Sequence, residues 1–345
     1  MSEVLNLSFH CALPISTDHG LLQMNSSQVS YNGTPDNSFY IVAFQTLESK
    51  NYLMLGLSFI YIITLMGNFI LLTTVFMNPS LHSPKYIAVC NLAMVDISIN
   101  SVIIPQMVPV FVFNLSRVPF EMCFSQMFFL HFFGDLESFS LAILAYDRLI
   151  AICLPLRYPS INTNQGMCFI VAAVWLLVFF LDAYPVGLAS KLPYCGSRVV
   201  RSCCCEHGPV YILACTDISF NRRLALTKTM IVLLTPLIFI IFSYIVVVAT
   251  VLKIASAEKS RKAFHTCFTH LLLVLTYYLP VILAYLLGSQ HLALSPDQLI
   301  AVLTVSVTMP PMLNPIIYSL KTEEVRVRIM KGLGFSVVVK MLWQF

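Results

Sequence analysis

The stretch LALTKTMIVLLTPLIFIIFSYIVVVATVL, residues 224–252, carries one charged side chain, Lys228, and is otherwise almost entirely apolar. A helix needs about 20 predominantly apolar residues to cross a bilayer. Six other runs have this character, so the expected spans are 52–77, 86–113, 122–147, 167–188, 224–252, 264–288 and 298–320. The sequence therefore predicts an all-α membrane protein whose chain forms a bundle of seven transmembrane helices.

The composition of the chain agrees with a membrane protein. Hydrophobic residues make up 58% of the sequence and charged residues only 10%, with a mean hydropathy of +0.82, whereas a soluble domain carries about 25% charged residues. The net charge of +4 is small and unclustered, which argues against a nucleic-acid partner. We find no phosphate-binding loop, metalloprotease helix or nucleophile elbow, so we expect neither an enzyme nor a cofactor.

The basic residues that flank the spans predict the orientation of the chain. More of these lysines and arginines fall on the side of the membrane that also holds the C-terminus. The positive-inside rule makes this the cytoplasmic side, so the N-terminus is expected outside and the C-terminus inside. We expect an outer tail over 1–51, a seven-transmembrane domain over 52–320, and an inner tail over 321–345 with a short amphipathic helix. The glycosylation sequons fall on the expected outer side, at Asn6, Asn25, Asn32 and Asn114.

Cysteines gather on the expected outer side of the membrane, where thiols meet an oxidising compartment. They are Cys123, Cys195, Cys203, Cys204, Cys205 and Cys215. A bridge from Cys123 to the loop 189–222 would fasten that loop over the bundle, although spacing alone does not give the connectivity. The run 203–205, with Glu206 and His207, has the alternative of binding a soft metal. We favour structural disulfides and expect no metal.

Two acidic residues lie where lipid would not tolerate them, and such groups are functional candidates by default. Counted at the helical rise from the inner face, Asp96 and Glu137 reach the same depth near the middle of the membrane. The pair favours a state-sensitive ion or proton site, which Asn68 and Asn314 would extend. The alternative is a static hydrogen-bonded contact between helices.

A second polar group lies nearer the expected outer face. His131 and Asp135 are four residues apart and so share one face of the third span. Lys228 lies in the outer half of the fifth span, where it would either pair with a ligand carboxylate or form an internal ion pair with Asp135. Both alternatives stay open. Tyr278 comes just before Pro280, which favours a kink and a moving outer half of the sixth span.

Four motifs at the expected inner helix ends resemble those of a known family. AYDRLIAIC at 145–153 resembles MAYDRYVAIC, LHSPKY at 81–86 resembles LHTPMY, KAFHTC at 262–267 resembles KAFSTC, and PMLNPIIYS at 311–319 resembles PMLNPFIYS. Together with Gly67, Asn68 and Trp175, these motifs give a resemblance that covers about residues 40–325. The chain is thus similar to the odorant receptors, of the fish type, within the rhodopsin-like G-protein-coupled receptors. It departs from them at Leu149, which replaces a Tyr, and at Lys85, which replaces an apolar Met.

The resemblance implies roles for the matching positions. It implies disulfides Cys123–Cys205 and Cys195–Cys215, and an activation switch with G-protein contacts formed by Asp147, Arg148, Tyr244, Lys262, Asn314, Pro315 and Tyr318. In the family, Tyr244 meets the switch on the seventh helix. Asp96 and Glu137 match the mid-membrane acids. The odorant cavity would be lined by His131, Asp135, Lys228, Tyr278, Val281 and Tyr285.

The resemblance also implies a function. A small odorant would enter from outside and favour the active bundle, in which the sixth helix opens a cleft for the heterotrimeric olfactory stimulatory G protein, raising cyclic AMP at the plasma membrane of olfactory cilia. Lys228 suggests a ligand with a carboxylate, such as an amino acid. The alternatives are a non-olfactory rhodopsin-like receptor for a peptide or amine and, from another class, a small-solute transporter, against which the absence of clear internal repeats argues.

Overall fold

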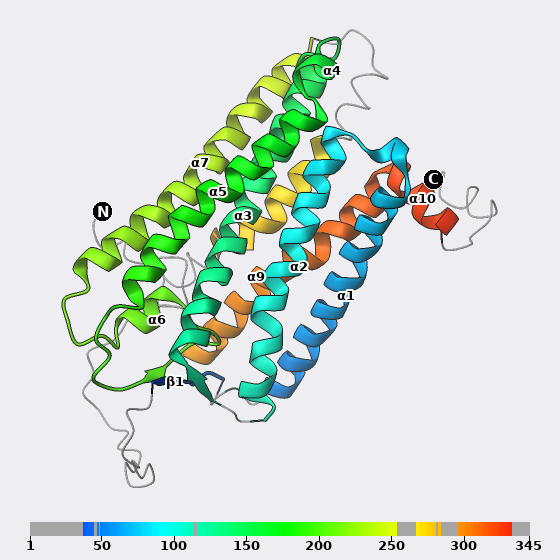
Figure 1. Ribbon diagram of the computed structural model, residues 1–345. Coiled ribbons are helices and arrows are strands. Elements are labelled where there is room, and N and C mark those ends of the chain that lie inside the picture. The colour runs from blue at the N-terminus through cyan, green and yellow to red at the C-terminus, as the bar shows by residue number, and fades with distance from the viewer. Residues whose placement is uncertain are drawn as a thin grey trace.

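The computed structural model describes residues 37–44, 47, 49–113, 116–253, 267–280, 282–283 and 295–332. Within them, the helices long and apolar enough to cross a membrane are α1 (Lys50–Met77), α2 (Pro84–Phe111), α3 (Phe120–Cys153), α5 (Asn164–Ala189), α7 (Ser219–Val251) and α9 (Pro296–Lys321). A shorter apolar helix, Cys267–Pro280, falls in the expected sixth span. The helices lie side by side in one bundle (Figure 1), which confirms the predicted seven-transmembrane architecture.

Burial separates inner from outer helices. In the most apolar stretch of each helix, 61% of the residues are buried in α2, but only 28% in α1 and 17% in α5. The exposed side chains of the outer helices are large and apolar, for example Phe69 on α1 and Phe169 on α5. Exposed apolar surface on this scale would be unfavourable in water but is what a lipid-facing helix presents. The outer surface of the bundle is therefore suited to lipid.

One end of the bundle, called the sheet end, carries the three strands and α6 (His207–Tyr211). Strand β1 (Ser38–Ile41) pairs antiparallel with β2 (Arg117–Pro119) and parallel with β3 (Val199–Val200). Because these strands come from three distant segments, the sheet joins the chain before α1 to the α2–α3 and α5–α7 connections. Phe39 of β1 packs its ring against Phe120 and Tyr194, and the centroids of the three rings lie 4.3–5.8 Å apart.

The opposite end, called the α10 end, carries η2 (Pro79–Leu81), α4 (Tyr158–Ile161) and α10 (Glu323–Gly332). In Figure 1, α4 and α10 stand at this far end of the bundle, away from β1 and α6. Val325 of α10 is fully buried, so α10 packs onto the bundle rather than extending from it. This helix falls within the tail 321–345, where we expected a short amphipathic helix.

Candidate functional site

Three charged side chains from three helices meet inside the bundle. The Lys228 Nζ of α7 lies 2.5 Å from Oδ2 of Asp135 on α3 and 2.6 Å from Oδ1 of Asp182 on α5. The side chains of Lys228, Asp135 and Asp182 are 5%, 16% and 0% exposed. Of the two alternatives for Lys228, the structure shows the internal ion pair, and it adds a second acid.

We call Lys228, Asp135 and Asp182 the Lys228 cluster. Its stability depends on the presence of all three side chains. Removing an ion from water costs several kcal/mol, which close opposite charges repay only when the geometry is good. With all three groups ionised, the cluster holds one cation and two anions, so one negative charge is in excess. Asp182 was not singled out from the sequence, because only the apolar length of the expected span 167–188 was considered. The rule that ionisable residues inside a span are functional candidates would have found it.

Two more of the predicted ligand residues surround the Lys228 cluster. The ring of His131, one helical turn from Asp135, stacks on His207 of α6 with centroids 4.5 Å apart. The Tyr278 hydroxyl, on the helix Cys267–Pro280, lies 2.8 Å from the Ser138 hydroxyl of α3. The predicted residues thus gather around α3 between the sheet end and the middle of the bundle. Val281 and Tyr285 lie outside the described residues.

Two disulfides fasten the α5–α7 connection. Cys123 at the start of α3 is bonded to Cys205, and Cys195 is bonded to Cys215, the same pairs that the resemblance implies. The backbone N–H of Cys205 also donates to Gln126 of α3, at 2.9 Å. The connection is therefore held against the sheet end of α3. The sequon residues Asn6, Asn25, Asn32 and Asn114 lie outside the described residues.

The mid-membrane acids lie deeper in the bundle. The Asn314 side-chain amide of α9 donates to both carboxylate oxygens of Asp96, at 3.0 and 3.1 Å, and Glu137 is buried close enough to Asp96 to interact electrostatically. We predicted that Asn68 would join this group, but its side chain makes no hydrogen bond to Asp96, Glu137 or Asn314. Its amide donates instead to the backbone carbonyls of Thr64 and Pro311.

The backbone of α1 comes close to α9 next to Asn68. A Cβ atom added at Gly67 would lie 2.9 Å from Cγ of Pro315, closer than van der Waals contact permits. Glycine at this position therefore lets α1 approach the segment that contains Asn314 and Pro315. This contact fixes the place of the predicted switch residues of α9 relative to α1.

At the α10 end, the predicted switch residues of α3 are held in a polar network. Arg148 lies 3.6 Å from the Asp147 carboxylate, which accepts hydrogen bonds from the Tyr158 hydroxyl at 2.6 Å and the Asn162 amide at 2.9 Å. Neither Tyr158 nor Asn162 was singled out from the sequence. Burial and the hydrogen bond to Asp147 raise the pKa of Tyr158.

Tyr244 of α7 has a different partner from the one that the resemblance implies. Its hydroxyl donates to the Cys267 carbonyl at 3.0 Å and lies 3.0 Å from Nδ1 of His270, whereas the resemblance places it against the switch on the seventh helix. The other ring nitrogen of His270 lies 3.0 Å from the Leu141 carbonyl. In this structure, Tyr244 therefore links α7 to the helix Cys267–Pro280. Lys262 lies outside the described residues.

Lys85, a departure from the family pattern, has a local partner. Its Nζ lies 3.7 Å from Oε2 of Glu324 on α10, and the hydroxyl of Tyr86 donates to the same carboxylate. The hydrogen bond from Tyr86, followed by the charge of Lys85, lowers the pKa of Glu324. These contacts connect the start of α2 to α10.

Comparison with known proteins identifies the family of this chain. A family model described as olfactory receptor matches residues 57–334. The chain is 36% identical over 297 residues to human olfactory receptor 10A5, covering 86% of this chain and 93% of the relative. It is 37% identical to human olfactory receptor 10A2 (83% and 94%) and 35% identical to mouse olfactory receptor 4E2 (77% and 85%). These relatives are mammalian, so the fish-type assignment stays a prediction. The chain belongs to the olfactory receptor family, whose members are G-protein-coupled receptors and not enzymes.

Proposed function

We propose that this odorant receptor recognises a small zwitterion, such as an amino acid, at the Lys228 cluster and signals through the olfactory stimulatory G protein to raise cyclic AMP. The observation that carries the ligand class is the buried contact of Lys228 with Asp135 and Asp182, at 2.5 and 2.6 Å. Family membership supports a small-molecule ligand and a G-protein partner.

The proposal needs the sheet end outside the cell. The flanking basic residues support this orientation through the positive-inside rule. Both disulfides lie at the sheet end, and disulfides persist in oxidising compartments such as the cell exterior. A ligand would then arrive beneath the fastened loop, and the α10 end would face the G protein in the cytoplasm. The receptor would act at the plasma membrane, in olfactory cilia.

Asp135 determines how a ligand would enter the cluster. With 16% of its side chain exposed, it is the most accessible of the three charged groups. A ligand carboxylate that binds Lys228 displaces the Asp135 carboxylate, which then needs a new cation because an unpaired buried charge is costly. A zwitterion supplies both charges, since its ammonium group binds Asp135. A simple amine, which would only neutralise the excess negative charge, is the runner-up ligand class.

Activation would follow from a shift between two arrangements of the helix Cys267–Pro280. Its polar contacts with α3 and α7 include the Tyr278–Ser138 hydroxyl contact and the His270 contacts with Leu141 and Tyr244. In the second arrangement, these contacts would be broken. A ligand that stabilises this second arrangement increases the fraction of receptors that adopt it. We further propose that Asp96 and Glu137 exchange an ion or a proton during this shift, because two neighbouring buried carboxylates do not both ionise without a cation.

The test is cyclic AMP production in cells that express this chain with the olfactory stimulatory G protein, challenged with amino acids, carboxylic acids, amines and neutral odorants. We expect a selective response to amino acids that Arg148→Ala abolishes and Asp135→Asn weakens at equal surface expression. Lys191→Ala, at an exposed position of the sheet end, is the matched control and keeps the response. A response to amines alone favours the runner-up ligand class, and a response only to neutral odorants overturns both.

A further inference from the structure

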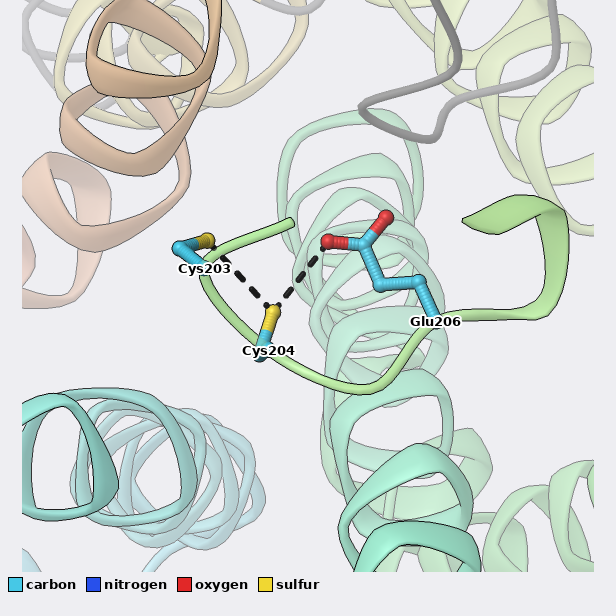
Figure 2. A group of neighbouring side chains, drawn as sticks. All are labelled: Cys203, Cys204 and Glu206. Atoms are coloured by element: carbon cyan, nitrogen blue, oxygen red, sulfur yellow. Dashed lines mark hydrogen bonds between the residues drawn. The ribbon is translucent and has the colours of Figure 1, made fainter. Parts of the chain in front are cut away.

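A second group of side chains with coordinating atoms lies at the sheet end, apart from the proposed ligand site. Cys203, Cys204 and Glu206 follow one another along the connection between β3 and α6, and all three are buried. Neither cysteine belongs to the disulfides Cys123–Cys205 and Cys195–Cys215. Figure 2 shows the two sulfur atoms and the carboxylate turned toward one another on this loop.

The distances within this group suit one shared ion. The sulfur atoms of Cys203 and Cys204 are 3.6 Å apart, and the Cys204 sulfur lies 3.2 Å from Oε1 of Glu206. One donor atom from each residue fits within 4.8 Å of both others. Two thiolates about 2.3 Å from a tetrahedral zinc ion lie about 3.8 Å apart, and a carboxylate oxygen lies about 3.6 Å from each sulfur. The two distances that involve the Cys204 sulfur are within about 0.4 Å of these values, and the Cys203 sulfur and the Glu206 oxygen are within 4.8 Å of each other, so small side-chain rotations bring the three donors around one ion.

We propose that Cys203, Cys204 and Glu206 bind a zinc ion. Two thiolates and a carboxylate are ligands that zinc accepts, and softness of the donors disfavours calcium and magnesium. On binding, both S–H bonds break, their protons pass to water, and two Zn–S bonds form without a change in the oxidation state of zinc. The two positive charges of the ion offset two of the three negative charges, which makes the buried carboxylate less costly.

The position of this site gives the ion a structural consequence. Thr304 of α9 places its hydroxyl oxygen 3.3 Å from the Cys203 sulfur, so the hydroxyl or a water molecule supplies the fourth ligand. The next residue after Glu206 is His207, which stacks on His131 beside the Lys228 cluster. Zinc would therefore fix the loop between α9 and the side chains next to the proposed ligand site. The zinc site itself does not depend on the ligand class proposed above.

The experiment uses the full chain, purified in lipid nanodiscs without reducing agent and titrated with zinc chloride. We expect one tightly bound zinc per chain by elemental analysis, none in C203S/C204S, and at least tenfold weaker binding in Glu206→Gln. Cys168→Ser, which removes an exposed thiol of α5, is the matched control and keeps the zinc. Zinc retained in C203S/C204S would overturn the proposal.

A second measurement needs no variant. Cobalt(II) added to the natural chain should give the near-ultraviolet absorption of thiolate-to-cobalt charge transfer, which zinc then removes. Intact-mass and thiol-alkylation analysis of the same sample should show both cysteines in the thiol form after chelation. A Cys203–Cys204 disulfide in the chain, or the absence of the cobalt band, would show that the two sulfurs do not serve as metal ligands.

Discussion

Two buried polar groups in this receptor are built on opposite principles. The Lys228 cluster contains its own cation, which touches both carboxylates. The Asp96–Glu137 pair contains two acids and an amide donor from Asn314, and no ion pair joins either acid to a lysine or arginine among the residues that the structure describes. The difference shows that the first group is balanced by a fixed internal charge, whereas the second has no such charge among the described residues and, as we propose, takes up a proton or an ion instead.

The largest expected effect comes from removing the internal cation. Lys228→Met leaves Asp135 and Asp182 buried without their partner, and breaking a buried ion pair in this way costs about 3–5 kcal/mol. We expect a severe loss of folded receptor at the cell surface, measured by flow cytometry with an N-terminal tag. Asp182→Asn in the same chain should restore part of it, because one of the two stranded charges is then gone.

The control for this prediction is Lys191→Met at the exposed position of the sheet end, which should leave the surface level unchanged. Should Lys228→Ala reach the surface normally and leave every agonist's potency unaltered, the Lys228 cluster would neither stabilise the receptor nor bind its ligand.

A smaller effect is expected where an acid is held by hydrogen bonds at the α10 end. Tyr158→Phe removes the 2.6 Å hydrogen bond to Asp147, and hydrogen bonds to charged groups contribute about 1.5–3 kcal/mol. If that bond favours the inactive state, agonist-free cyclic AMP should rise several-fold at equal surface expression. Tyr184→Phe, on the exposed side of α5, is the control, and equal basal signals in both variants would contradict the role of Tyr158.

The pair without a cation should tolerate neutralisation better than the Lys228 cluster does. Asp96→Asn keeps an oxygen that accepts a hydrogen bond from Asn314, so the expected loss of stability is about 1 kcal/mol. Thermal unfolding of the purified chain and the surface level in cells would measure this loss. Agonist potency should also become less sensitive to sodium concentration or pH. A loss of surface receptor as severe as that of Lys228→Met would remove the contrast between the two groups.

The smallest effect is expected at Glu324, whose own side chain is largely exposed in its ion pair with Lys85. The Tyr86 hydrogen bond lowers the pKa of Glu324 below its ordinary value of 4.5, so the folded state favours the charged form. Its contribution to stability is complete above pH 4.5 and is lost as the pH falls through the lower folded-state pKa.

Glu324→Gln should therefore reduce the free energy of unfolding by at most about 1 kcal/mol at pH 7, because exposed pairs contribute little. The difference between the natural chain and the variant should shrink at acidic pH. Calorimetry of the purified protein at several pH values would measure it, and a difference that grows on acidification would contradict a lowered pKa of Glu324 in the folded state.

Sequence reasoning predicted the bundle because apolar run length has a direct physical meaning in a membrane. It also gave the ion pair between Lys228 and Asp135 as one of two alternatives for Lys228, and the structure contains that pair. It did not predict Asp182 as their partner or the hydrogen bond from Asn68 to Pro311. Those contacts depend on how each helix is rotated about its axis and packed, which a count of residues along one helix does not contain.

The most direct test of the proposed recognition combines a change in the receptor with a change in the ligand. Cyclic AMP dose–response curves are recorded for the natural chain and Asp135→Asn, each with the amino acid agonist and with its analogue lacking the amino group. We expect either single change to raise the half-maximal concentration at least tenfold, and the two changes together to add little more, because both remove the same interaction. Fully additive losses would contradict the claim that Asp135 binds the ligand's ammonium group.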